Sequence, residues 1–185
     1  MAQERNHSAI RITATALFMA LNISLSSYGI PVPGGHLYLC DVAICLAAIL
    51  LNPAEAFVVG GLGSFIGDMI FYPLPMFVSL VVHGLQAVVI SLISHRVLKK
   101  HPVSASAIGV SVGAVIMVVG YTLGKAFIYS TPEYAIIKLP YEIAQGTVGA
   151  VFGMILCWKC RIHALFNRMI ENGFQRQEEK VCTRN

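Results

Sequence analysis

The chain has 185 residues, of which 56% are hydrophobic and only 12% are charged. Soluble domains carry about 25% charged residues, so this composition excludes an ordinary soluble domain and indicates an integral membrane protein. The net charge of +4 does not indicate nucleic-acid binding, because the cations stand at the ends of apolar runs, where membrane topology explains them.

The apolar runs predict six membrane helices, since the hydrocarbon core of a bilayer takes about 20 apolar residues per helix. In chain order these helices cover residues of about 10–28, 39–51, 54–70, 75–98, 104–129 and 139–160, followed by a polar cytoplasmic tail over 161–185. Long runs without alternation exclude a β-barrel. The prediction is therefore one all-α membrane domain, 1–185, folded as a compact six-transmembrane-helix bundle.

Proline and glycine mark the connections between these helices. The segment 31–35 contains two prolines and two glycines and cannot be regular helix. Pro53 suits the first position of a helix, Tyr72 and Pro73 end the third helix, and Pro132 with Glu133 is interpreted as a turn before the sixth. The first apolar run is longer than a signal-peptide core, so it is interpreted as a helix.

Lysines and arginines orient the predicted bundle. They gather in the N-terminus, in the connection at 95–101 and in the C-terminal tail, whereas the turns at 29–38 and 71–76 carry none. Positively charged connections stay in the cytoplasm. We therefore predict that both termini and the connection at 95–101 are cytoplasmic, and that His36 and Glu133 face outward.

One face of the predicted fifth helix carries three polar residues. Tyr121, Lys125 and Tyr129 are four residues apart and so lie above one another. One interpretation is that Lys125 reaches the outer membrane interface between belt tyrosines. The alternative is a cation that lines a pocket with two aromatic walls.

Two other predicted helices carry polar pairs three residues apart. Glu142 and Gln145 lie near the same outer level as Lys125, so a shared pocket would neutralise both charges and offer donors and acceptors to a ligand. A purely structural ion pair is the alternative. On the fourth helix His83 and Gln86 line the same pocket or bond between helices.

Four further polar residues are predicted to lie at or near the outer ends of the helices. Asp41 begins the second helix, where the helix dipole favours a carboxylate and a capping role is expected. Asp68 ends the third helix, where the dipole is unfavourable, so it requires a partner or water. His36 and Tyr38, in the segment rich in glycine and proline, are expected to cover a pocket as a lid.

Three further motifs do not meet the requirements of the sites that they resemble. Cys157, Cys160 and His163 have ligand-like spacing but lack a fourth ligand near them, so no metal site is predicted. The GYTLGKA segment at 120–126 has the wrong spacing for a phosphate loop. Neither a Ser/His/Asp set nor a paired-carboxylate motif stands out, so the sequence predicts neither an enzyme nor a cofactor.

Small residues four apart on the first helix suggest a contact with another protein. Such pairs let helices approach closely in a membrane. Most pairs in this chain are expected to pack the bundle itself. Ala16 and Ala20 differ because they lie beside the basic cytoplasmic start of the chain, where an external partner helix is able to dock.

Four segments together resemble one protein family. They are GHLYLCD (35–41), LAAILLNPAEAFVVGGLGSFIGD (46–68), HGLQ (83–86) and LPYEIAQ (139–145). The chain resembles the substrate-binding S components of energy-coupling factor (ECF) vitamin transporters, in the riboflavin and hydroxymethylpyrimidine group. HGLQ stands where many relatives have KGLE, so this chain departs from the family pattern at His83 and Gln86.

The resemblance implies a six-helix protein that binds a vitamin at its extracellular end with high affinity. Family pockets involve the first loop and the outer halves of helices 4 to 6. The family's partners are a membrane T subunit, which meets the Ala16 and Ala20 motif, and two cytoplasmic ATPases. A multi-pass protein of the bacterial plasma membrane is expected.

Two rival functions stay open from the sequence. One is a proton-coupled carrier that uses Asp41, Asp68 or Glu142, and the other is a membrane assembly subunit without a ligand. The polar residues suit a small heterocycle such as hydroxymethylpyrimidine, pyridoxine or riboflavin. A strongly anionic ligand would need more cations than the chain offers.

Overall fold

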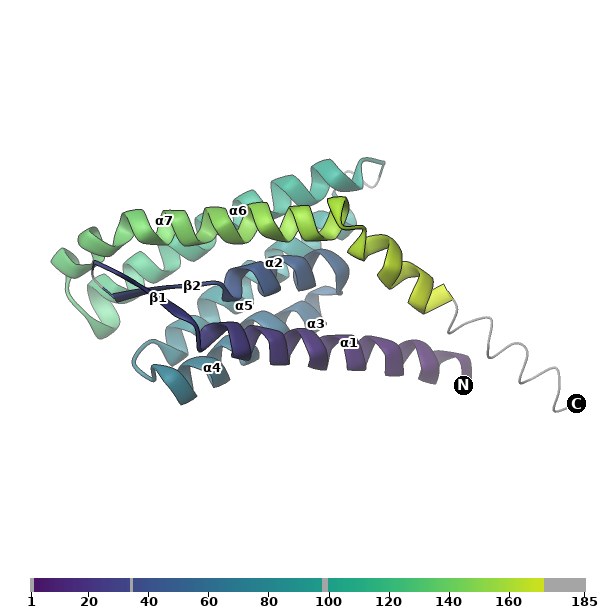
Figure 1. The fold of residues 1–185 in the computed structure, drawn as a ribbon, viewed down its shortest axis with the longest axis horizontal. Helices are drawn as coiled ribbons and strands as arrows, with labels where there is room; N and C mark the ends of the chain where they lie inside the picture. The colour runs from purple at the N-terminus through teal and green to yellow at the C-terminus, as the bar shows by residue number, and fades with distance from the viewer. Residues whose placement is uncertain (1, 34, 98–99, 172–185) are drawn as a thin grey trace, which may run out of the picture.

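The computed structural model of the protein describes residues 2–33, 35–97 and 100–171, with side chains from residue 9 onward. The chain is a helical bundle with a short β-hairpin at one end (Figure 1). Its elements are α1 (Ala2–Ser26), β1 (Gly29–Val32), β2 (Gly35–Tyr38), α2 (Cys40–Leu50), α3 (Pro53–Phe57), the π-helical turn η1 (Val58–Leu62), α4 (Gly63–Phe71), α5 (Met76–Arg96), α6 (Pro102–Gly124), the π-helical turn η2 (Lys125–Tyr129), α7 (Pro132–Met154) and the π-helical turn η3 (Ile155–Lys159).

Four helical segments of the described chain are long and apolar enough to cross a membrane. They are Ala9–Ser26, Pro53–Phe71, Met76–Arg96 and Pro102–Tyr129. A fifth span is obtained if Pro132–Lys159 is taken together with Ile162–Glu171, which is bent from it by 54°. The predicted helix at 39–51 is the 11-residue α2, too short to cross alone. The structure thus supports an all-α membrane protein with four or five candidate spans, and the predicted count of six is not confirmed.

The last long helix begins earlier than predicted. The sequence suggested a turn at Pro132 and Glu133 and a helix from 139, but α7 begins at Pro132. Thr131 caps the helix by accepting a hydrogen bond from the Tyr134 backbone N–H, and proline suits the first helical position. The turn was therefore a helix start, and Lys138 becomes a helical residue instead of a turn residue.

The segment at 29–38 forms an antiparallel hairpin in which Gly29 pairs with Tyr38 and Val32 with Gly35. This agrees with the expectation that it is not helix and adds two strands to a chain that was predicted to be all helical. The hairpin lies at one end of the bundle, beside the beginning of α2 (Figure 1).

Helix α2 forms the centre of the bundle. Every residue in it except Val42 is buried, as expected for a helix that is apolar on all sides. It packs against α1, α5 and α7. Glycines permit the close approach of α7: a Cβ added to Gly149 would lie 2.4 Å from the Asp41 Cβ, and one added to Gly153 would lie 2.8 Å from the Cys45 Cβ.

Helix α3 begins at a capping box, in which Asn52 and Glu55 each bind the backbone N–H of the other. Asn52 accepts a hydrogen bond from the Glu55 backbone N–H at 3.0 Å, and the Glu55 carboxylate accepts one from the Asn52 N–H at 3.2 Å. Pro53 occupies the first helical turn, as predicted. Glu55 also pairs with Arg11 at 2.7 Å, which fixes α1 against this turn.

The two ends of the bundle differ in charge. The beginning of α1, the end of α5 and the helix Ile162–Glu171 lie at one end, opposite the hairpin (Figure 1). Arg96, Lys100, Arg161 and Arg168 belong to this basic end.

The charge asymmetry gives a topology prediction. In a variant without native cysteines, a cysteine at position 36 is expected to react with an impermeant thiol reagent added outside cells, whereas a cysteine at position 100 is expected to react only after permeabilisation. Labelling of position 100 but not of position 36 in intact cells would reverse the orientation.

Candidate functional site

A cavity of about 230 Å³ lies beside the hairpin. The end of α1, β2, the beginning of α2, α4, α5, α6, η2 and α7 all contribute to its walls. The lining side chains are Ser26, His36, Tyr38, Cys40, Ser64, Asp68, Tyr72, Pro75, His83, Met117, Tyr121, Lys125, Tyr129, Tyr134, Lys138, Glu142 and Gln145. A concave site with aromatic walls and a few polar groups is the usual form of a small-molecule site.

Lys125 and Glu142 form a buried ion pair in the cavity wall. Their side chains are only 7% and 5% exposed, so Lys125 does not reach out to a membrane interface. Its Nζ lies 5.0 Å from the Tyr121 ring centre and 5.9 Å from that of Tyr129, within cation–π range. The π-helical turn η2 begins at Lys125, and such turns often occur at functional sites.

Asp41 is the centre of a hydrogen-bond network beneath the cavity. Its side chain is buried, and its two oxygens accept hydrogen bonds from the amide groups of Gln86 at 3.0 Å and Gln145 at 2.7 Å. Leu39, not Asp41, is the N-cap residue of α2. The predicted capping role of Asp41 is therefore wrong, because its carboxylate joins α2 to α5 and α7.

The same network reaches the histidine and the hairpin. Because the Gln86 amide nitrogen donates to Asp41, its oxygen is free to accept from His83 Nδ1 at 2.7 Å, and this assigns the proton to that nitrogen. The Gln145 oxygen accepts from the Tyr38 backbone N–H at 2.9 Å. Gln145 thus connects the hairpin with Asp41, whereas Gln86 stands behind the cavity wall.

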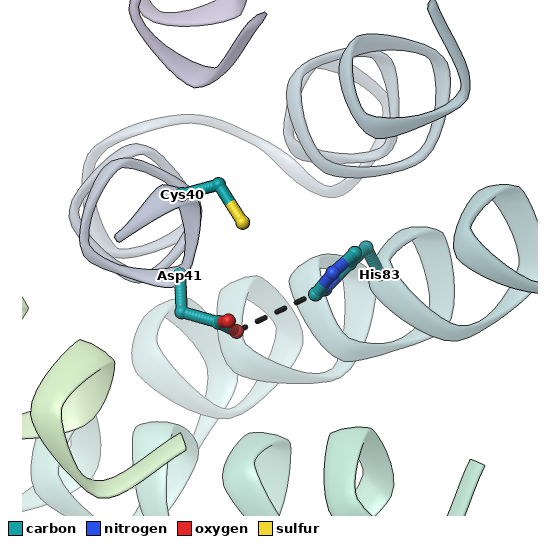
Figure 2. A group of neighbouring side chains, drawn as sticks. All are labelled: Cys40, Asp41 and His83. Carbon is teal, nitrogen blue, oxygen red and sulfur yellow. Dashed lines mark ion pairs between the residues drawn. The ribbon is translucent and has the colours of Figure 1, made fainter. Parts of the chain in front are cut away.

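Cys40, Asp41 and His83 also meet the distance requirement for a metal site, and Figure 2 shows their side chains converging. Their ligand atoms lie within 4.8 Å of one another. Hydrogen bonds account for this arrangement without an ion, because both Asp41 oxygens accept from amides. His83 Nδ1 lies 3.8 Å from Asp41 Oδ1.

Near the other end of the bundle, the ligand-like spacing belongs to Cys157, Cys160 and His163. Among the described residues, these three do not form a group with metal-binding distances. Cys157 is buried and Cys160 is exposed. His163 stacks on the Trp158 ring at 4.7 Å between centroids.

Asp68 reaches the cavity from α4. Its carboxylate accepts a hydrogen bond from the Ser79 hydroxyl, which in turn is bonded to the Tyr121 hydroxyl.

Burial raises the pKa of Tyr38 above its ordinary value, and nearby Asp68 acts in the same direction. The Tyr38 hydroxyl consequently stays protonated and available as a donor in the hairpin.

Lys138 enters the cavity wall from α7. Its side chain is buried and donates a hydrogen bond to the His36 carbonyl oxygen, which ties the hairpin to α7. Lys138 was not predicted to belong to the site, because the sequence pattern places this residue in a turn.

Eight of the nine residues predicted to contact a ligand line this cavity, and the ninth, Gln86, does not. The eight are His36, Tyr38, His83, Tyr121, Lys125, Tyr129, Glu142 and Gln145. The lining residues missed from sequence include Asp68, Lys138, Tyr72 and Tyr134. A signal for Asp68 and Lys138 was present, since an ionisable residue inside an apolar segment indicates a site by default.

Ala16 and Ala20 lie on the exposed face of α1. Their neighbours Leu17 and Leu21 are 68% and 43% exposed, which makes this an apolar surface. Ser26, at the end of the same helix, lines the cavity. Ala16 is ten residues away, or about 15 Å along the axis, so the surface and the cavity are separate sites.

Comparison with known proteins identifies the family. The family model described as "ECF-type riboflavin transporter, S component" matches residues 6–161. The chain belongs to this family. This S component is therefore part of a transporter and not an enzyme, and it is a multi-pass protein of the plasma membrane. Family membership implies a small vitamin-class ligand and partner subunits of the ECF type.

Two curated relatives cover most of the S component. An uncharacterized protein in a gap 3' region of Pyrococcus woesei is 28% identical over 136 residues, which is 72% of this chain and 89% of the relative. The thiamine precursor transporter HmpT of Lactococcus lactis subsp. cremoris (strain MG1363) is 29% identical over 156 residues, which is 82% of this chain and 87% of the relative.

Proposed function

We propose that the S component binds a single-ring heterocyclic vitamin or vitamin precursor, with hydroxymethylpyrimidine as the first candidate. A membrane T subunit and two cytoplasmic ATPases energise its import. The cavity beside the hairpin carries this proposal. The thiamine-precursor activity named for the relative HmpT supports the choice of a pyrimidine.

The size of the cavity favours one ring over three. Its volume of about 230 Å³ lies below the roughly 300–1,000 Å³ of pockets for drug-sized ligands. Its tyrosines offer flat apolar faces to a ring and hydroxyl groups to its substituents. A tricyclic ligand such as riboflavin would require the hairpin to move away from α7.

Binding to purified protein tests the proposal. We expect titration calorimetry on detergent-purified protein to detect hydroxymethylpyrimidine, and native mass spectrometry of gently purified protein to detect a retained one-ring compound. Riboflavin is expected to bind much more weakly. Tight riboflavin binding together with no pyrimidine binding would contradict the proposal.

The exposed alanines give a prediction about assembly. Replacing both Ala16 and Ala20 with Trp fills the surface on which a T-subunit helix is proposed to pack. We expect loss of co-purification with the T subunit and ATPases, while ligand affinity of the isolated protein stays within about twofold, because the cavity is about 15 Å away.

Val115→Trp is the matched control for this assembly experiment, since Val115 is 62% exposed on α6. It is expected to leave co-purification unchanged. If the double Trp variant still co-purifies, the docking surface lies elsewhere.

Dependence on ATPases separates the proposal from a stand-alone carrier. In vesicles that contain this chain alone, a proton gradient is expected to drive no uptake of the pyrimidine. Uptake is expected when the T subunit, the ATPases and ATP are present. Uptake by the chain alone would support the carrier.

A further inference from the structure

The charges that line the cavity are not all paired with one another. Two carboxylates and two lysines line it: Asp68, Glu142, Lys125 and Lys138. Lys125 and Glu142 neutralise each other directly. In the described part of the chain, no cationic nitrogen lies within ion-pair distance of Asp68 and no carboxylate lies within that distance of Lys138.

Asp68 is arranged to accept further hydrogen bonds. Ser79 donates to one of its oxygens, so the Tyr121 hydroxyl is the donor in the contact between Tyr121 and Ser79. Both hydroxyl protons in this chain therefore point along it toward the carboxylate. A carboxylate inside an apolar bundle is costly without a donor or a cation.

Lys138 is able to donate further hydrogen bonds, as Asp68 is able to accept them. Its side chain is buried, and its ammonium group carries three N–H donors, one of which bonds the His36 carbonyl. An oxygen acceptor on a ligand in the cavity would satisfy another of these donors.

The two groups belong to different walls of the cavity. Asp68 is on α4, which packs against α1 and α5, whereas Lys138 is on α7, which packs against α2 and α6. A ligand in the cavity is therefore able to meet the Asp68 acceptor on one helix and the Lys138 donor on another.

We propose that Asp68 and Lys138 select a dipolar ligand, with an amino group or protonated ring nitrogen against Asp68 and an oxygen substituent against Lys138. This inference rests on the proposed function and narrows the ligand to amino-substituted nitrogen heterocycles that carry a hydroxyl group. It also excludes phosphate esters, because their charge would meet Asp68 and Glu142 with only two lysines to oppose four negative charges.

A pair of pyrimidines tests the role of Asp68. One is 4-amino-5-hydroxymethyl-2-methylpyrimidine, and the other carries a methoxy group in place of its amino group. In titration calorimetry we expect wild-type protein to prefer the amino compound by about tenfold or more, since a carboxylate cannot donate to the oxygen of the other ring. Asp68→Asn is expected to reduce this preference to less than about threefold, because an amide both donates and accepts.

Variants of Lys138 provide the contrasting result. Lys138→Met should weaken both pyrimidines by about the same factor, because it removes a contact to the hydroxymethyl oxygen that they share. Lys138→Arg keeps the charge and should restore much of the affinity. Ser106→Ala is the control and should leave both affinities unchanged, since Ser106 is buried on α6 and donates a hydrogen bond to the Pro102 carbonyl of its own helix.

The possible failures are distinguishable. If wild-type protein binds neither pyrimidine, the proposed function fails and this inference with it. If it binds both equally, or if Asp68→Asn binds with an unchanged preference, the inference alone is overturned. Should Asp68→Asn not fold, the wild-type preference decides: a preference for the amino compound below about threefold overturns the inference.

Discussion

Lys125→Met and Glu142→Gln are each expected to reduce ligand affinity by about a hundredfold or more. Each change removes one partner of a buried ion pair and leaves the other charge in the cavity wall. Loss of a buried hydrogen bond to the ligand costs about 1–3 kcal/mol, and more where a charge is left unpaired, while about 1.4 kcal/mol corresponds to a tenfold change in affinity. Titration calorimetry with hydroxymethylpyrimidine measures the loss directly.

The double variant separates stability from recognition. Lys125→Met combined with Glu142→Gln leaves neither charge unpaired, so its thermal unfolding temperature is expected to exceed that of either single variant. Its ligand affinity is expected to stay low, because the wall has lost both polar groups. Arg96→Gln, at the exposed end of α5, should remain within about twofold of wild type. Single variants with wild-type affinity would move the binding site away from η2 and α7.

Gly149→Ala is expected to lower both the thermal unfolding temperature and the ligand affinity. The new Cβ would lie 2.4 Å from the Asp41 Cβ and 3.1 Å from its backbone carbonyl carbon, so α2 and α7 must separate. Overpacking of this kind costs about 1–3 kcal/mol, and about 1 kcal/mol lowers the unfolding temperature of a protein of this size by about 2–4 °C. The separation also pulls Gln145 from the Asp41 carboxylate.

Gly146→Ala is the matched control on the same helix. A Cβ there would lie 3.5 Å from the Ala114 Cβ, an ordinary contact. Alanine favours a helix over glycine by about 1 kcal/mol, so this variant should unfold at the same temperature as wild type or higher. Equal unfolding temperatures for the two variants would show that α7 does not depend on this close approach.

The pairing of Lys125 with Glu142 was accessible from the sequence for a physical reason. Spacing placed each residue on the polar face of a helix, and the cost of a charge in lipid makes such faces turn toward each other. Spacing fixes the face of a residue but not its depth. Gln86 therefore does not line the cavity, whereas His83, three residues before it, does.

Local explanations sufficed for Asp41 and Lys138 in the sequence, and both proved incomplete. Asp41 at a helix start needed no distant partner, yet two amides from α5 and α7 bind it. Lys138 was placed outside the helix because Pro132 and Glu133 were interpreted as a turn. Pro132, which follows the capping Thr131, instead begins α7. Long-range contacts outweighed these local readings, and a single sequence does not contain those contacts.

The predicted count of six spans is not confirmed, and the second helix is the reason. Apolar composition does not distinguish a helix that faces lipid from one enclosed by other helices, because both lack charges. The predicted second helix is apolar enough for a membrane, but at 11 residues it serves as the core of the bundle. The length of this helix, and not its hydropathy, indicates that it is internal to the bundle.

The length of α2 also sets the depth of the cavity. Eleven residues at 1.5 Å each make a column of about 16 Å, roughly half of the ~30 Å hydrocarbon layer. The cavity begins where this column ends, at Cys40. Insertion or deletion of one helical turn would raise or lower the cavity floor by about 5.4 Å, so a bundle with the same outer surface can be fitted to shorter or longer ligands through the length of one internal helix.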